Sequence, residues 1–189
     1  WDVEGLQNIL KNSYGANVPL KGMVDEGMDV DDILKLIQKG FVTSHEVKEK
    51  NIEALQKRFP EAVLWSNIEE TNACPQVIII NCIGILSSLY QYANLAVIGG
   101  GFNAGIHNIL EPACFGLPVL FGPKHQKFDE AAAMIKQGSE FSFKEYKEFE
   151  NHLLQLLASK EKQAAIQLKQ ANYLQKQAGA TDFILSKII

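Results

Sequence analysis

From Phe41 to the end of the chain, short apolar runs alternate with stretches that have helical periodicity. Val77–Asn81 is apolar at four successive positions, as expected of a strand that is covered on both faces of a sheet. Strands that alternate with helices indicate a parallel α/β sheet. The other strands we expect are Phe41–Ser44, Ala62–Trp65, Leu95–Ile98, Val119–Phe121 and Glu140–Phe143, and the expected helices are Glu46–Phe59, Gly84–Tyr92, Phe128–Gln137, Tyr146–Ala158, Lys160–Ala178 and Thr181–Ile188.

The first forty residues have a weaker pattern. Asp2–Asn12 and Val30–Gln38 have helical periodicity, and aspartates at positions 29, 31 and 32 suit the start of the second helix. Between them, Tyr14–Gly27 carries turn residues and little periodicity, so it offers no clear strand.

Val97–Pro123 reads as a strand, a glycine-rich turn, a short helix and a second strand. Proline has no amide hydrogen and is tolerated only in the first turn of a helix, so Pro112 places the helix start near His107 or Asn108. A glycine at 116 and a proline at 118 predict that the helix ends after about two turns. The free amides and the helix dipole would then favour an anion above the glycines at 100, 101 and 105.

The segment GGGFNAGIHNILEPACFGLPVLFGPKHQKF resembles the donor-site signature of the 3-deoxy-D-manno-octulosonic acid (Kdo) transferases. The resemblance continues back through Ile79–Tyr90 and His45-Glu46 and forward to Gly179–Ile188, so it covers the chain from about Phe41 onward. It implies a Rossmann-like α/β fold, the carboxyl-terminal half of a GT-B glycosyltransferase. On this view residues 1–189 form one donor-binding domain, of which residues 1–40 match the family poorly. The resemblance also implies that the amino-terminal acceptor domain is absent. If Trp1 is the tryptophan that follows the family's first strand, that strand preceded Trp1.

The implied activity is inverting transfer of Kdo from CMP-Kdo to a lipid A precursor at the cytoplasmic face of the bacterial inner membrane. The family's catalytic glutamate belongs to the amino-terminal domain, which also holds the acceptor. We therefore expect no catalytic residue in this chain, no activity of the chain alone, and peripheral membrane association of the whole enzyme.

Glu111 has two possible roles. In the resembled family a glutamate at this place binds the ribose hydroxyls of the nucleotide. Alternatively, Asn108 and Glu111 have the spacing of a capping box, with Asn108 as the N-cap. With the flanking motif included, we favour ribose binding.

The resemblance implies further donor contacts, each with a structural alternative. Ile83 and Gly84 lie at the turn that the family places near the base, and Asn81 stands there where the family commonly has aspartate. His45 could contact the sugar acid, or it could simply belong to a polar turn. The other donor-binding residues we expect are Gly100, Gly101, Gly105, His107, Asn108, Lys124 and Lys127.

Composition excludes several other functions. The formal net charge is −4, and Arg58 is the sole arginine, so nonspecific nucleic-acid binding is disfavoured. Three cysteines without CxxC spacing fit a reduced compartment. The histidines lack metal-ligand spacing, and Asp29-Val30-Asp31 is better explained as an acidic helix start than as a metal site. We expect neither metal nor cofactor. Two alternatives stay open: another GT-B enzyme that uses a UDP-sugar, and a noncatalytic nucleotide-binding module.

Overall fold

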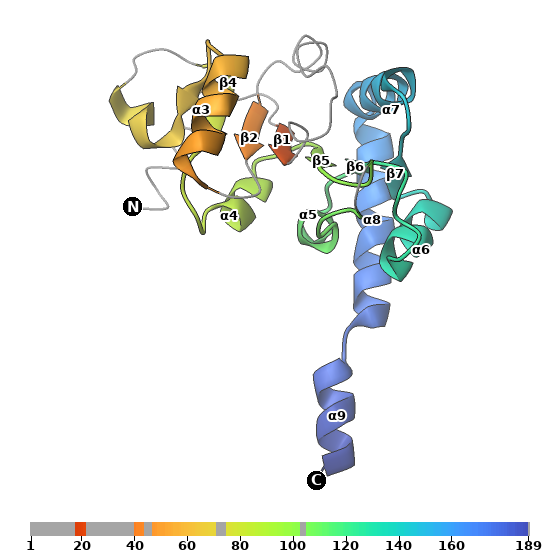
Figure 1. Ribbon diagram of the computed structural model, residues 1–189. Coiled ribbons are helices and arrows are strands. Elements are labelled where there is room, and N and C mark those ends of the chain that lie inside the picture. Colours follow the sequence, from red (N-terminus) through yellow and green to blue (C-terminus); the bar gives the residue numbers. More distant parts are fainter. Residues whose placement is uncertain (1–17, 22–39, 44–46, 71–74, 103–104, 189) are drawn as a thin grey trace.

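The computed structural model describes residues 18–21, 40–43, 47–70, 75–102 and 105–188. Seven parallel strands among them form one sheet in the order β3-β4-β2-β1-β5-β6-β7 (Figure 1). The strands are β1 (Val18–Lys21), β2 (Gly40–Thr43), β3 (Val63–Leu64), β4 (Val77–Ile80), β5 (Ala96–Ile98), β6 (Val119–Phe121) and β7 (Glu140–Ser142). The helices are α3 (Glu49–Arg58), the 3₁₀ helix η2 (Trp65–Glu70), α4 (Leu86–Tyr90), α5 (Leu110–Cys114), α6 (Asp129–Gln137), α7 (Tyr146–Ala158), α8 (Lys160–Gln177) and α9 (Ala180–Ile188).

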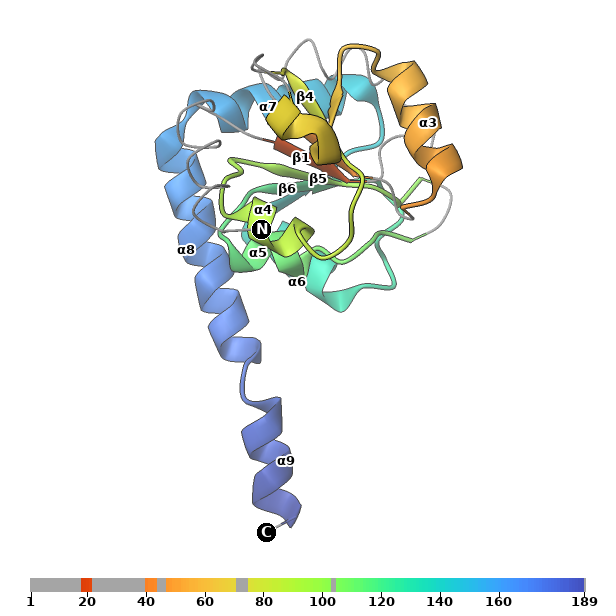
Figure 2. The ribbon, with the colours of Figure 1, turned by 90° about the vertical axis from the view of Figure 1, so that its left-hand side faces the viewer.

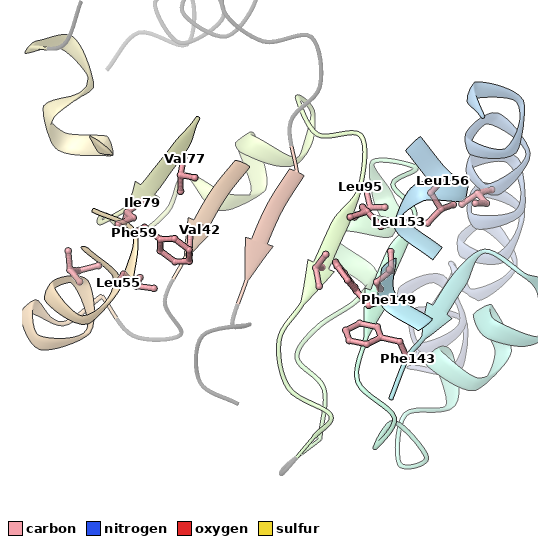
Figure 3. Packing of buried hydrophobic residues seen from close by; sticks show 14 residues of the cluster. Val42, Leu55, Phe59, Val77, Ile79, Leu95, Phe143, Phe149, Leu153 and Leu156 are labelled. Atoms are coloured by element: carbon pink, nitrogen blue, oxygen red, sulfur yellow. The ribbon is translucent and has the colours of Figure 1, made fainter. Parts of the chain in front are cut away.

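The central strands are buried on both faces, and their side chains alternate between two hydrophobic layers. Val97 and Leu120 belong to a cluster that also contains side chains of α3 and α7. Figure 3 shows Leu55 of α3 and Phe149 of α7 in this layer. The neighbouring residues of β5 and β6 belong to a second cluster, to which α4 and α6 contribute Tyr90, Ala131 and partly buried side chains. Helices thus cover both faces of the parallel sheet, as the apolar runs predict.

The last two helices differ in how they contact the rest of the chain. α8 is polar along most of its length and buries only Ile166 and Gln170. α9 follows it and projects away from the body of the molecule (Figure 2). Phe183 of α9 is 65% exposed and Ile188 is 75% exposed. None of the helices in the described ranges has the length and apolar character needed to cross a membrane.

The sheet contains a central strand that the sequence pattern does not indicate. Val18–Lys21 forms β1 in the middle of the sheet, with β2 on one side and β5 on the other. The segment gave no signal because it has only four residues and contains Pro19, which cannot donate a hydrogen bond to a neighbouring strand. The two helices expected within the first forty residues lie outside the described residues, as do Asp29 and Asp31.

The remaining strands and helices lie where the pattern predicts them, with ends that differ by up to three residues. Two differences affect the candidate site. The residues after β3 form η2, which the sequence did not indicate. The helix that contains Pro112 has five residues and begins at Leu110, two residues later than Asn108.

Candidate functional site

The loops that carry the motif residues gather at the carboxyl ends of the parallel strands. β1 pairs with β2 on one side and with β5 on the other, so the strand order changes direction between β1 and β5. Ligands of open α/β sheets bind outside the carboxyl ends of strands at such a switch point. The glycine-rich loop follows β5 directly and therefore begins at this place.

The glycine-rich loop folds back on itself through backbone hydrogen bonds. Gly100 forms an isolated antiparallel bridge with Ile106, and the amide of Gly101 donates to the carbonyl oxygen of Gly105 at 3.2 Å. The amide of Lys124, after β6, donates to the carbonyl oxygen of Gly101 at 2.7 Å. The loops after β5 and β6 thus form one hydrogen-bonded unit.

Close packing within this unit explains its glycines. Gly101 has φ of +85°, and a Cβ there would lie 2.8 Å from Cγ2 of Ile106 and 2.9 Å from the Cα of Gly122. A Cβ on Gly105 would lie 2.8 Å from the ring of Phe128. These distances are shorter than real Cβ contacts. Gly101 therefore requires glycine even without a ligand, because its contacts include backbone and its φ is positive, whereas a side chain at Gly105 would need the ring of Phe128 to move. Gly122 was not among the expected site residues, and its signal in the sequence is a glycine directly after the apolar strand β6.

The side chain of Asn108 binds the backbone at the start of α5, whose N-cap is Ile109, so it does not form the capping box that its spacing predicts. Its Oδ1 accepts a hydrogen bond from the amide of Leu110 at 3.0 Å, whereas a capping box would engage the amide of Glu111. Its Nδ2 donates to Oε1 of Glu111 at 3.0 Å. The expected reciprocal box is therefore replaced by a side-chain pair.

The carboxyl group of Glu111 is exposed while one of its oxygens is held by Asn108. The hydroxyl oxygen of Tyr90 is buried nearby and has no hydrogen-bond partner in the described part of the chain. Burial, and secondarily the negative charge of Glu111, raise the pKa of Tyr90. The hydroxyl group of Tyr90 is thus a buried hydrogen-bond donor without a partner in the described part of the chain.

The turn after β4 has two anchored residues and two that face solvent. Asn81 is hydrogen-bonded through its side chain to Ser66 of η2, and Cys82 packs on the hydrophobic cluster below. Ile83 is 86% exposed, and Gly84 has φ of +96° with no atom within 4 Å of a Cβ placed there. Gly84 thus borders open space, in contrast to the glycines after β5.

The expected cationic and histidine contacts lie on the loops around the same edge. Lys124 and Lys127 are exposed on the loop after β6, and His107 is half-buried. The amide of His107 donates to the carbonyl oxygen of Gly99 at 3.4 Å, which joins this residue to the glycine loop. His45 lies outside the described residues.

A cavity of about 380 Å³ lies at the opposite ends of the strands. Its walls come from the residues before β5 and β6 and from one face of α8, so it is separate from the motif loops. The lining residues are Ala93, Asn94, Phe115, Gly116, Leu117, Pro118, Lys160, Gln163, Ala164 and Gln167. Within the described ranges, no group of three or more His, Cys, Asp or Glu residues could hold a metal ion.

The chain is similar in sequence to curated Kdo transferases, although no family profile matches it. It is 40% identical over 86 residues to the 3-deoxy-D-manno-octulosonic acid transferase of Aquifex aeolicus, which is 44% of this chain and 24% of that protein. It is also 40% identical over 103 residues to the enzyme of the same name from Chlamydophila psittaci, 52% of this chain and 24% of that one. The chain thus spans about a quarter of the length of these relatives. A shorter 70-residue stretch is 40% identical to the translocase subunit SecA of Ruthia magnifica, over 8% of that protein.

Solved structures match nearly the whole chain. The C-terminal CMP-Kdo binding domain of WaaA from Acinetobacter baumannii has a TM-score of 0.74 and 18% identity, over 91% of this chain and 95% of that chain. Anabaena HepE in complex with UDP has a TM-score of 0.65 and 14% identity, over 98% of this chain and 50% of that one. Because the sequence identities are below 20%, these structural matches show a shared fold and do not by themselves show a shared function. The chain is therefore similar in sequence to the 3-deoxy-D-manno-octulosonic acid transferases over about half of its length, and it has the α/β fold of the carboxyl-terminal domain of WaaA.

Proposed function

We propose that this chain is the donor-binding domain of an inverting glycosyltransferase that transfers Kdo from CMP-Kdo to a lipid A precursor. The observation that carries the proposal is the 40% identity to two Kdo transferases. The fold supports it, because the domain of WaaA that it resembles over nearly its full length is described as binding CMP-Kdo.

In this proposal Glu111 binds the ribose of the donor. A carboxylate has two acceptor oxygens and suits the two neighbouring hydroxyls of a ribose. Asn108 holds Oε1 at 3.0 Å, which reduces the conformational freedom that binding would otherwise remove. The carboxyl group is exposed, so a ligand can reach its free oxygen.

The phosphate and the sugar acid of the donor would lie above the glycine-rich loop and the start of α5. α5 has only five residues, and the amide of Leu110 already donates a hydrogen bond to Asn108. The helix start therefore has a weaker dipole and fewer free amides for binding an anion than we expected from the sequence. Lys124 and Lys127 are the exposed cations of the adjoining loop. We assign the phosphate and sugar-acid contacts to these lysines and to His107. Gly100, Gly101 and Gly105 shape the loop that carries them.

The base would lie at the turn of Ile83 and Gly84, after β4. β4 and β5 are three strand positions apart in the sheet, about 14 Å, a separation that an extended nucleotide can bridge. The side chain of Asn81 is bonded to Ser66, so the backbone of the turn is the part that can read the base.

The chemistry would be displacement at the anomeric carbon of Kdo as CMP departs into this domain. The acceptor hydroxyl loses its proton to a general base, which we assign to a part of the enzyme outside this chain, along with the lipid A site and peripheral contact with the inner membrane. This domain contributes electrostatic stabilisation of the leaving phosphate. The chain alone should therefore show no turnover with CMP-Kdo and a lipid A acceptor.

A titration with CMP, UMP and UDP, followed by heteronuclear NMR or calorimetry, tests the proposal. We expect weak, saturable binding of CMP, because a cleft between two domains makes all its contacts only when both walls are present. No response at millimolar CMP would overturn the donor-site assignment. Stronger binding of UDP would favour a UDP-sugar enzyme, for which the likeness to the HepE complex with UDP is the supporting observation.

A further inference from the structure

Asn81 and Ser66 form a two-point contact that joins η2 to the end of β4. The amide of Ser66 donates to Oδ1 of Asn81 at 3.1 Å, and Nδ2 of Asn81 donates to Oγ of Ser66 at 3.0 Å. Oγ of Ser66 in turn donates to Oδ1 of Asn67 at 2.6 Å. Both the oxygen and the nitrogen of the Asn81 carboxamide are thus hydrogen-bonded to Ser66 of η2.

The same turn is also anchored from below. Cys82 and Ile85 pack on a hydrophobic cluster that includes Trp65 and Ile68 of η2. Trp65 and Ile68 are each 5% exposed, so η2 is fixed to the sheet on both sides of Ser66. A turn that is held by packing and by paired hydrogen bonds has little freedom to shift.

What this anchored turn presents to solvent is an apolar side chain and open backbone. Ile83 is 86% exposed, and the space beside Gly84 is empty to 4 Å. Holding a large aliphatic side chain in water does nothing for the stability of this chain. A flat, partly apolar ring that lies against Ile83 would remove that surface from water.

We propose that Ser66 and Asn81 are positioning residues, which fix the turn of Asn81–Gly84 so that its backbone discriminates cytosine from uracil. The inference rests on the proposed function, because it takes the base of the donor to lie at this turn. Ser66 acts through Asn81 and does not itself touch the ligand. Ser66 was not among the expected site residues, because it lies in η2, a helix that the sequence pattern does not indicate.

The selectivity follows from hydrogen-bond direction. Cytosine presents an amino donor where uracil, like thymine, presents a carbonyl acceptor, so one backbone group can satisfy only one of the two bases. A small displacement of that group weakens the correct hydrogen bond and relaxes the rejection of the wrong base. Loss of the Ser66–Asn81 contact should therefore lower the ratio of CMP to UMP affinity as well as CMP affinity itself.

The test compares CMP and UMP affinities of the full 189-residue chain with those of three variants. Ser66→Ala and Asn81→Ala should each lower CMP affinity by about two- to tenfold, the value of one ordinary hydrogen bond, with a smaller change for UMP. Asn81→Asp should stay within about twofold of the parent, because its carboxylate still accepts from the amide of Ser66 and can accept from the hydroxyl. NMR of the Ile83 methyl groups should report a displaced turn in the alanine variants and the parental position in the aspartate variant.

Ser159→Ala serves as the matched control. It removes a serine hydroxyl that accepts from the amide of Lys162 at the start of α8, away from the turn. It should destabilise the chain and leave the CMP to UMP ratio unchanged. An unchanged ratio in folded Ser66→Ala, or an aspartate variant as impaired as Asn81→Ala, would overturn this inference alone. Absence of CMP binding by the parent chain would overturn the proposed function and this inference with it.

Discussion

Asn108 donates a hydrogen bond from Nδ2 to Oε1 of Glu111 at 3.0 Å. The same asparagine accepts from the amide of Leu110, so one side chain binds the first backbone amide of α5 and also holds the carboxylate that follows it. The reciprocal capping box expected from the spacing is thus not formed, and the ligand role of Glu111 stays a prediction. The carboxylate of Glu111 is exposed, so its second oxygen stays accessible to a ligand.

Glu111→Gln should separate the ligand role of this residue from its structural role. Glutamine keeps the length and an acceptor oxygen for Asn108, so the free energy of unfolding should change by less than about 0.5 kcal/mol. It loses the charge, and a hydrogen bond to a charged group is worth about 1.5–3 kcal/mol. We expect CMP affinity, measured by calorimetry, to fall by roughly ten- to a hundredfold.

Glu61→Gln is the matched control for this change. Glu61 is exposed in the turn between α3 and β3, so its substitution removes the same charge far from the carboxyl ends of the strands. It should leave CMP affinity unaltered. Should Glu111→Gln bind CMP within about twofold of the parent, a difference of ~0.4 kcal/mol, Glu111 would have no part in binding the donor.

Gly101→Ala should destabilise the chain more than Gly84→Ala. Both glycines have φ near +90°, but only at Gly101 would the new methyl group lie within 3 Å of Ile106 and Gly122. Backbone strain alone costs about 1–2 kcal/mol, and overpacking adds about 1–3 kcal/mol. Urea unfolding of both variants measures the difference, and equal losses of stability would show that the loop can absorb a side chain.

The sequence predicted most strands of the sheet, but it did not predict the first one, β1. Buried parallel strands such as Val77–Ile80 are recognisable in the sequence as uninterrupted apolar runs, and the structure confirms this strand. β1 is equally central, but Pro19 interrupts its apolar pattern. Its pairing partners are Gly40–Thr43 of β2 and Val97 and Ile98 of β5, which lie far from it in the sequence and are brought beside it only by the fold. Strand pairing over such separations leaves no local signal.

Parts of the candidate site could be predicted where a residue type has one strongly preferred backbone position, as proline and glycine have at helix ends. Pro112 lies within the first turn of α5, and Gly116 has the positive φ, +73°, of a helix end. The partners of Asn81 and Gly101 could not be predicted, because Ser66 and Gly122 come from other strand–loop units. Whether the predicted residues contact a donor stays a prediction until a nucleotide is bound.

Removal of α9 should leave the rest of the fold intact. Its apolar side chains are about half to three-quarters exposed, so deleting residues 180–189 removes little buried surface. The unfolding free energy should change by less than about 0.5 kcal/mol, the range of ordinary surface changes. Urea unfolding of the truncated and complete chains measures it. A loss of several kcal/mol would mean that α9 folds back on the domain in solution.

Glu140, the first residue of β7, should make the stability of the chain fall as pH rises. It is 1% exposed, and neither carboxyl oxygen has a hydrogen-bond partner in the described ranges. Burial, and then the nearby charge of Glu130, raise its pKa from 4.5 to about 9. Between these two values the folded chain keeps a proton that the unfolded chain releases. The contribution of Glu140 to stability is therefore fully present below about pH 4.5 and is lost progressively as pH rises toward 9.

The slope from one such group is at most about 1.4 kcal/mol per pH unit. Glu140→Gln, which stays neutral, should flatten the slope, so it should gain stability relative to the parent between pH 5 and pH 8. Urea midpoints of both proteins at these two pH values measure the difference, and Glu61→Gln is the control for removal of an ordinary exposed carboxylate. Parallel pH dependence of the parent and Glu140→Gln would show that Glu140 ionises in the folded chain with an ordinary pKa, because water or a rearranged partner then reaches its carboxyl group.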